Sequence, residues 1–509
     1  MSEGRTKKAA MNVAFNFLNQ ILTLILSFVS RTVFVWGLGA EYLGINGLFS
    51  DVLGLLSMAD LGFGTAMVYS FYKPLADNDY RKIAGLTTFY KKVYTIIAAV
   101  VSIVGVALIP FLPYLINLEK DIPHLTLYYL LSLANVVFSY LCVYRTSILS
   151  ADQKSFKITR ITMIVNIIRS ILQIMGIAIW KSYTLYLVLG CISVLINNLI
   201  ASYVAVKEYP FIKNSVELKA DERKNIFANI GSVFLYKVSS VLLNTTDNML
   251  ISVIVGTIAV GYYSNYLMLQ NKISMFYTLL FTSLTASIGN LIVNEKAERR
   301  YEIFCCEQSV SFIACGFVIP CYILLVNDLM SIWLGDDFVL DNLVVVAIGL
   351  NMYLSCVLQP LWSYREATGL YRKTKWIMIM CAVLNLVLSI ILGKIVGLAG
   401  ILFASGLSRL LTYVWYEPRL LFKEYFELSP KKYYIQLSLN AILIIFLVIG
   451  IGFLSSFIQV NSVLSWFVKA CFVGITSLTI VLMIYSKTEG FRILRLKIEM
   501  YLKNRKRQF

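Results

Sequence analysis

Long apolar runs follow one another along almost the whole chain, and short polar links separate them. Because roughly 20 consecutive apolar residues cross the hydrocarbon core as a helix, each run predicts one transmembrane helix. The pattern therefore predicts an all-α integral membrane protein with about 14 transmembrane helices and no large soluble domain. The predicted spans are 10–35, 42–71, 92–117, 122–149, 158–180, 183–206, 226–254, 257–292, 303–327, 340–364, 375–397, 399–418, 433–457 and 464–486.

Basic residues alternate between the polar links. If the N-terminus is cytoplasmic, 36 of the 45 Lys and Arg residues lie in inner segments, and only Lys120, Lys181 and Lys394 lie in outer links. Since basic residues of short loops stay on the cytoplasmic side, we expect both termini in the cytoplasm of a multi-pass protein. The net charge of +17 follows from this topology and from contact with anionic lipids, so it does not support nucleic-acid binding.

Composition agrees with the membrane assignment, because 59% of the residues are hydrophobic and 14% are charged. The nine cysteines have no metal-binding spacing, and the one histidine, His124, lies in a polar link. No phosphate-binding loop indicates direct use of ATP. We therefore expect no metal, no cofactor and no catalytic residue.

An internal repeat relates the two halves of the chain. Gly39 and Gly44 follow a polar cluster and precede a long apolar run, and Gly256 and Gly261 do the same with identical spacing. Six helices per half give parallel repeats, which is the architecture of transporters that open alternately to each side. The predicted parts are an N-terminal six-helix lobe at 1–209, a C-terminal six-helix lobe at 210–430, an additional helix pair at 431–486 and a basic cytoplasmic tail at 487–509.

The chain contains the short motifs Ser30-Arg31, Gly37-Leu-Gly39, Ala59-Asp60-Leu-Gly62-Phe-Gly64, Asn244-Thr-Thr-Asp247-Asn248 and Gly397-Leu-Ala-Gly400. Together they resemble the polysaccharide flippase family of the multidrug/oligosaccharidyl-lipid/polysaccharide exporter superfamily, over nearly the whole chain. The resemblance implies two six-helix lobes around a central cavity, often with two extra C-terminal helices. It also implies transfer of an undecaprenyl-pyrophosphate-linked oligosaccharide to the outer leaflet of a bacterial cytoplasmic membrane, for capsule, exopolysaccharide, O-antigen or teichoic-acid-like assembly.

Ionisable residues inside predicted spans are the candidate site residues, because charges in a membrane are costly and usually face a cavity or a partner. Cations suit a pyrophosphate, and arginine can contact two phosphate oxygens at once. The expected substrate-binding residues are Arg31, Arg169, Lys237, Lys272 and Arg409. The expected gating or coupling residues are Asp60 and Asp247, with H⁺ or Na⁺ as the possible coupling ion.

Each assignment has an alternative. Arg31 and Asp247 occupy comparable places in the two repeats, so an ion pair between the lobes is as well supported as substrate contact. Asp60 precedes two glycines, where a carboxylate that bonds exposed backbone is favoured over a coupling role. For Arg169 and Arg409, pairing within a lobe competes with a position facing the cavity.

Two other functions fit the sequence less well. An ion-coupled multidrug exporter of the same superfamily would favour carboxylates in its cavity, whereas cations dominate the candidates here. A polysaccharide polymerase or membrane glycosyltransferase would favour a substantial external loop, whereas the longest outer link, around Asn327 to Asn342, has roughly fifteen residues. The expected partners of a flippase are membrane lipids, the lipid-linked glycan and polysaccharide polymerase or assembly proteins.

Overall fold

The chain is helical throughout the part that the structure describes. Nine helices there are long and apolar enough to cross a membrane, or up to eleven when each of two bent pairs counts as one span. The predicted all-α, multi-pass membrane architecture is therefore confirmed. The computed structural model describes residues 2–60, 63–117, 122–218, 223, 245–282, 288, 291–292, 295–368 and 370–496.

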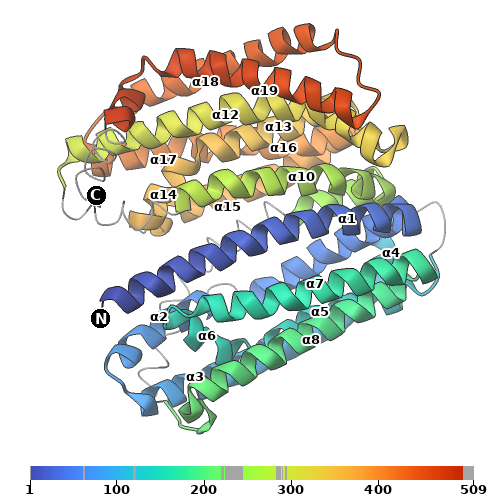
Figure 1. Cartoon of the computed structure of the whole chain (residues 1–509), viewed down its shortest axis with the longest axis vertical. Coiled ribbons are helices and arrows are strands. Elements are labelled where there is room, and N and C mark those ends of the chain that lie inside the picture. Colours follow the sequence, from blue (N-terminus) through green and yellow to red (C-terminus); the bar gives the residue numbers. More distant parts are fainter. Residues whose placement is uncertain are drawn as a thin grey trace. The chain divides into compact units, whose positions relative to one another are not determined.

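The chain divides into two compact units, of which the first is Met1–Gly261. In this unit α7 packs against both α1 and α8, α8 packs against α5, and α5 packs against α3 (Figure 1). The described helices of the first unit are α1 (Ser2–Leu56), α2 (Phe63–Ala76), α3 (Tyr80–Ala107), α4 (Leu112–Leu115), α5 (Leu125–Tyr140), α6 (Val143–Ala151), α7 (Ser155–Trp180) and α8 (Tyr183–Glu208), with short 3₁₀ turns at Ser57–Asp60, Ile109–Phe111 and Pro210–Lys213.

The second unit is Tyr262–Phe509. Here α12 packs against α13 and against the C-terminal helices α18 and α19, and α16 packs against α13 and α15 (Figure 1). Its described helices are most of α10 (Thr257–Thr282), then α12 (Ala297–Leu334), α13 (Asn342–Val357), α14 (Gln359–Thr368), α15 (Tyr371–Val396), α16 (Leu398–Leu411), α17 (Tyr413–Leu421), α18 (Lys431–Ser455) and α19 (Val463–Tyr485), with 3₁₀ and π turns at Asp336–Phe338 and Phe422–Phe426.

The same helix order occurs twice, and two pairs of corresponding helices start at equal spacing. The first residues of α3 and α12, Tyr80 and Ala297, are 217 positions apart, and so are those of α5 and α13, Leu125 and Asn342. The neighbours also correspond, because α5 packs on α8 as α13 packs on α16. Helices α5 and α6 meet at a bend of 48°, and α13 and α14 meet at a bend of 43°. The lobe boundaries given above remain a prediction.

Each glycine of the repeated pairs has a distinct structural role. Gly39 and Gly256 have φ angles of 87° and 132°, which a residue with a Cβ adopts only at a cost. Gly44 and Gly261 lie where α1 and α10 cross within the first unit. A Cβ at Gly44 would lie 2.0 Å from the main-chain oxygen of Thr257, and a Cβ at Gly261 would lie 2.2 Å from that of Ala40. The two repeat-related glycines therefore contact each other reciprocally, which explains their shared spacing.

At the two bends, side chains from neighbouring helices donate hydrogen bonds to main-chain carbonyl groups. Pro360 has no N–H to bond the Cys356 carbonyl, so the helix breaks there. Ser311 of α12 donates to that Cys356 carbonyl oxygen at 2.8 Å. In the first unit, Asn198 of α8 donates to the Phe138 carbonyl at 2.8 Å. Because a free carbonyl in a span costs several kcal/mol, these donors allow the bends.

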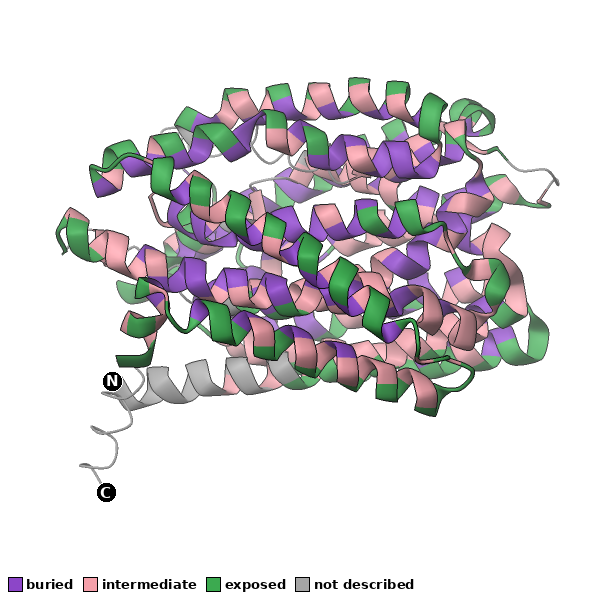
Figure 2. Ribbon diagram, turned by 90° about the horizontal axis from the view of Figure 1, so that it is seen from above, coloured by how far each residue is buried: buried purple, intermediate pink, exposed green. Residues whose placement is uncertain are grey.

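Some predicted span boundaries differ from the structure. The first two predicted spans join in α1, which continues through a kink at Gly39. The second span, 42–71, is interrupted by the turn at Ser57–Asp60, and spans 122–149 and 340–364 are each bent. The hydropathy of a segment predicts that it crosses the membrane, but it does not predict a bend within the segment. Figure 2 shows buried and exposed residues alternating along the same helices, as expected where one face meets protein and the other lipid.

Candidate substrate-binding site

In the first unit, a polar face of α7 and a face of α1 that carries Arg31 both lie near Tyr186 of α8. Arg169 and Gln173 are one turn apart on α7, so they lie on the same face of that helix. The Gln173 side-chain amide donates to the Tyr186 carbonyl of α8 at 2.8 Å. On α1, Arg31 precedes Phe34 by one turn, and the Phe34 ring packs edge-on against the Tyr186 ring with centroids 5.1 Å apart. Helices α1, α7 and α8 therefore all contribute to the surroundings of Tyr186.

Tyr186 brings two of the predicted arginines together. Arg31 and Arg169 both interact electrostatically with the half-buried Tyr186. The buried Nε of Arg169 has no hydrogen-bond partner among the residues that the structure describes. We call these three residues the Arg31–Arg169–Tyr186 cluster. Two guanidinium groups and a phenol offer donors for an anion and an aromatic face for an apolar or sugar surface.

Further aromatic rings lie next to this cluster. The buried Tyr183, three residues before Tyr186, has its ring centroid 4.9 Å from that of Tyr128 on α5 and 5.2 Å from that of Tyr42 on α1. Its hydroxyl group donates to the Asn46 side-chain oxygen at 3.2 Å. Aromatic surroundings lower the local polarity, which strengthens electrostatic interactions of the neighbouring arginines.

The two predicted coupling aspartates lie in different surroundings. Asp247 lies close enough to Asp51 for the two carboxyl groups to interact electrostatically, and the Asn248 side-chain amide donates to Asp51 at 2.6 Å. Asp60 ends the 3₁₀ turn after α1 and interacts electrostatically with Tyr94 on α3. The ion pair between Arg31 and Asp247 stays a prediction.

Two of the other predicted cations, Arg409 and Lys272, lie in the second unit. Arg409 lies on α16 in the second unit and donates to the Ser355 hydroxyl of α13 at 3.1 Å, and it interacts electrostatically with the buried Tyr277 of α10. Lys272 lies half-buried on α10. Lys237 lies outside the described residues.

Sequence reasoning did not select Tyr186. The chain has 32 tyrosines, and residue type does not distinguish a tyrosine of a binding site from one at a membrane interface. The available signal was the spacing of Tyr183 and Tyr186, which places both rings on one face of a helix beside a polar face of α7. Within the described ranges, no group of three or more His, Cys, Asp or Glu residues is arranged to hold a metal ion.

Comparison with known protein families and solved structures identifies what this chain is similar to. A family model described as "Polysaccharide biosynthesis protein" matches residues 9–285, more than half of the 509-residue chain. None of the curated protein sequences matches the chain significantly.

Three solved structures share the fold at low sequence identity. The lipid II flippase MurJ in an inward closed conformation is 16% identical, with a TM-score of 0.66 over 94% of this chain and 99% of that chain. An inward-facing multidrug resistance transporter of the MATE family is 16% identical, with a TM-score of 0.61 over 78% and 94% of the two chains. A MOP superfamily transporter from Pyrococcus furiosus is 15% identical, with a TM-score of 0.52 over 81% and 95%.

These similarities confirm the superfamily suggested by the sequence motifs. The fold is that of the multidrug/oligosaccharidyl-lipid/polysaccharide exporter superfamily, and the matched model identifies the branch within it. The chain belongs to the polysaccharide biosynthesis protein family.

Proposed function

We propose that this protein is a flippase that moves an undecaprenyl-pyrophosphate-linked oligosaccharide repeat unit from the inner to the outer leaflet of the bacterial cytoplasmic membrane. The repeat unit then enters capsule, exopolysaccharide or O-antigen assembly. The family membership supports this role, and one similar fold belongs to a protein named a lipid II flippase. The observation that carries the proposal is the Arg31–Arg169–Tyr186 cluster within the first unit.

Charge explains why such a cluster suits this substrate. In an idealised Born treatment, moving one ion from water into a medium of low dielectric costs on the order of 20 kcal/mol, so a pyrophosphate needs fixed cations along its path. A guanidinium group can bond two phosphate oxygens, and the Nε of Arg169 is a donor without a partner among the described residues. The ring of Tyr186 offers an apolar face against which a sugar ring can pack.

The transport cycle follows from the repeated architecture. Two similar halves that rock against each other open a central site alternately to each side of the membrane. In this scheme Lys237, Lys272 and Arg409 add contacts to phosphate or sugar during passage. Asp60 and Asp247 serve gating or coupling to H⁺ or Na⁺. The prenyl tail stays in lipid, and polysaccharide polymerase or assembly proteins receive the glycan.

No covalent chemistry is needed for this role, so we propose a transporter and not an enzyme. A multidrug exporter is the second candidate, because one similar fold is named a multidrug resistance transporter. Exporters of organic cations need negative charge at the site, and Arg31 and Arg169 supply the opposite sign. A polymerase or glycosyltransferase is the third candidate, and nothing in the described residues favours it.

Complementation of a flippase-deficient bacterium with a matched glycan pathway tests the proposal. The readouts are surface polysaccharide and lipid-linked repeat units that accumulate in the inner leaflet. Wild-type protein restores export, and Arg31→Ala, Arg169→Ala and Arg409→Ala restore it poorly. Loss of one charge-assisted hydrogen bond worth about 1.5–3 kcal/mol lowers the transport rate roughly 10- to 100-fold.

The matched control is Arg299→Ala, because this exposed arginine is paired with the nearby and also exposed Glu302. It exports like the wild type. Tyr186→Phe retains the ring and exports better than Tyr186→Ala. If the wild type leaves the repeat units inside and confers resistance to cationic drugs, the exporter replaces the flippase. If all arginine variants are expressed normally and export normally, the cluster is not the binding site.

A further inference from the structure

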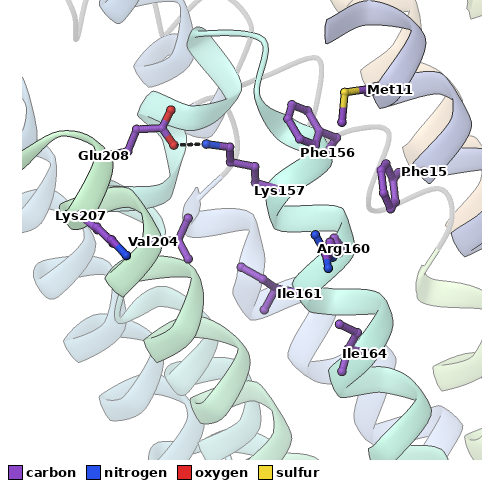
Figure 3. A pocket seen from close by; sticks show the side chains of 10 residues that line it. All are labelled: Met11, Phe15, Phe156, Lys157, Arg160, Ile161, Ile164, Val204, Lys207 and Glu208. Atoms are coloured by element: carbon purple, nitrogen blue, oxygen red, sulfur yellow. Dashed lines mark hydrogen bonds and ion pairs between the residues drawn. The ribbon is translucent and has the colours of Figure 1, made fainter. Parts of the chain in front are cut away.

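A pocket separate from the Arg31–Arg169–Tyr186 cluster lies where α7 begins and α8 ends. It has a volume of about 680 Å³. Figure 3 shows Met11 and Phe15 of α1 on one side and the first turns of α7, with Arg160 and Ile164, on the other. Lys207 of α8 completes the lining. The pocket therefore combines an apolar wall with cationic side chains.

The one carboxylate of the pocket is already neutralised. Glu208 forms ion pairs with both Lys154 and Lys157 (Figure 3 marks the second). Lys154, which caps α7 outside the membrane span, also pairs with Asp152 at 2.5 Å and bonds the Tyr209 hydroxyl group at 2.9 Å. Burial acts against the charge of Lys154, but these hydrogen bonds raise its pKa above the usual value. The network stays charged and balanced at neutral pH.

Two further cations line the pocket and are not neutralised by an ion pair with a described residue. Arg160 and Lys207 are exposed, and neither forms an ion pair with a residue that the structure describes. They lie on adjacent helices, because α7 and α8 pack together and are joined by only two residues, Lys181 and Ser182. Their combined charge attracts an anion to the mouth of the pocket.

An apolar stripe leads away from these cations along α7. Ile164, Ile168 and Ile171 follow Arg160 at helical spacing, and their side chains are 46%, 53% and 49% exposed. Large exposed aliphatic side chains at this spacing form a lipid-facing stripe.

A second stripe runs along α8 from the same end. Tyr203, Leu199 and Ile196 precede Lys207 at similar spacing and are also exposed. Because α7 and α8 are antiparallel, both stripes start at the cations. Both then run in the same direction, towards the link that joins the two helices. The stripes and the pocket form one surface. Arg160 and Lys207 lie at one end of it, and apolar side chains cover the rest.

We infer that this surface binds one anionic phospholipid, whose head-group phosphate lies between Arg160 and Lys207 and whose acyl chain follows the stripe of α7 and α8. Charge complementarity selects an anionic head group, and the apolar stripes select an acyl chain over a soluble phosphate or nucleotide. The basic end faces the leaflet that the distribution of Lys and Arg assigns to the cytoplasm. The inference does not depend on which substrate the protein transports.

Native mass spectrometry of the purified full-length protein tests this site. The protein is titrated with phosphatidylglycerol, with phosphatidylcholine of the same chains, and with inorganic phosphate. We expect one phosphatidylglycerol to be retained with higher affinity than phosphatidylcholine. Arg160→Ala/Lys207→Ala should lower the affinity for phosphatidylglycerol roughly 30-fold, which corresponds to about 2 kcal/mol for two cations at a lipid surface.

The matched control is Lys91→Ala/Lys431→Ala, which removes two exposed basic residues that do not line the pocket. It should bind phosphatidylglycerol like the wild type. A photoreactive phosphatidylglycerol should crosslink to the segments around Arg160 and Lys207 in the wild type, and this crosslink should disappear in the pocket variant.

Several results would overturn the inference. Equal losses in the pocket variant and the control would show only a general effect of surface charge. Equal retention of phosphatidylcholine would remove the selectivity for an anion. Competition by inorganic phosphate alone would show that the acyl chain contributes nothing. Retention of undecaprenyl phosphate without phosphatidylglycerol would assign the pocket to the transport substrate. Unchanged thermal unfolding of both variants ensures that folding does not explain a loss.

Discussion

Replacing Gly44 by alanine should destabilise the first unit despite improving helix propensity. The added Cβ would lie 2.0 Å from the Thr257 carbonyl oxygen, whereas ordinary contacts lie at 3.4–4 Å. Backbone atoms cannot rotate away as side chains do, so α1 and the start of α10 must separate by about 1 Å or more.

The expected magnitude is a balance of two effects. Overpacking of this kind costs about 1–3 kcal/mol and more when backbone must move. Alanine in place of glycine returns about 1 kcal/mol of helix propensity. We therefore expect Gly44→Ala to lower the free energy of unfolding by about 1–2 kcal/mol. Gly261→Ala should behave alike, because its Cβ would meet the Ala40 carbonyl oxygen at 2.2 Å.

The reciprocal contact makes a sharper prediction for the double variant. Once the helices have separated to admit one methyl group, the second enters at little further cost. Gly44→Ala/Gly261→Ala should therefore cost at least about 1 kcal/mol less than the sum of the single changes. The measurement is a double-mutant cycle of unfolding free energies in detergent micelles.

Gly47→Ala is the matched control on the same helix. Its Cβ would lie 3.4 Å from a side-chain carbon of Val260, which is an ordinary contact, so stability should stay the same or increase. The reasoning is refuted if Gly44→Ala behaves like Gly47→Ala. Additive costs of Gly44→Ala and Gly261→Ala would also contradict it, because they would mean that the two glycines do not share one contact.

Three further predictions concern stability in detergent, followed by thermal or denaturant unfolding. Glu417→Leu removes the ion pair that Glu417 forms with the buried Arg365 and should cost about 3–5 kcal/mol, whereas Arg365→Leu/Glu417→Leu should recover most of the loss; equal stability of the single and double variants would contradict this. Ser462→Ala removes the capping box at the start of α19 and should cost about 1 kcal/mol, with Ser462→Thr as the conservative control. Tyr485→Phe leaves the buried Asn440 amide without its acceptor and should cost about 1–3 kcal/mol; an unchanged midpoint would show that the 2.6 Å bond contributes nothing.

Spans with uninterrupted apolar runs were predictable from sequence. The predicted ranges 158–180, 183–206 and 464–486 agree with α7, α8 and α19 to within a few residues. Hydropathy reports the length of hydrocarbon crossed, and these helices cross it without a break. The bend at Cys356 was not predicted, although Pro360 is a local signal for it; the part absent from the local pattern is its support by the Ser311 hydroxyl group, 45 residues away. Such long-range donors leave no trace in the local pattern.

The candidate site was predictable only in part. Arg31 and Arg169 were selected because charge is costly in a span, and the structure brings them to one tyrosine. Tyr186 was not selected, because an aromatic residue is favourable at many places in a membrane protein. The sequence also contained no sign of the link from Gln173 to the Tyr186 carbonyl, which depends on how α7 packs on α8. Side-chain type indicated the arginines, and only tertiary packing identified their partner.

The equal spacing of the helix starts in the pairs α3/α12 and α5/α13 has an evolutionary consequence. From Tyr80 to Leu125 and from Ala297 to Asn342, no net insertion or deletion separates the two copies, although few residues match. One inserted residue rotates the rest of a helix by about 100° and turns its protein-facing side towards lipid. After a duplication, substitutions can therefore accumulate freely while changes in length are removed. An equal distance between helix starts is therefore what an internal duplication predicts where few residues match.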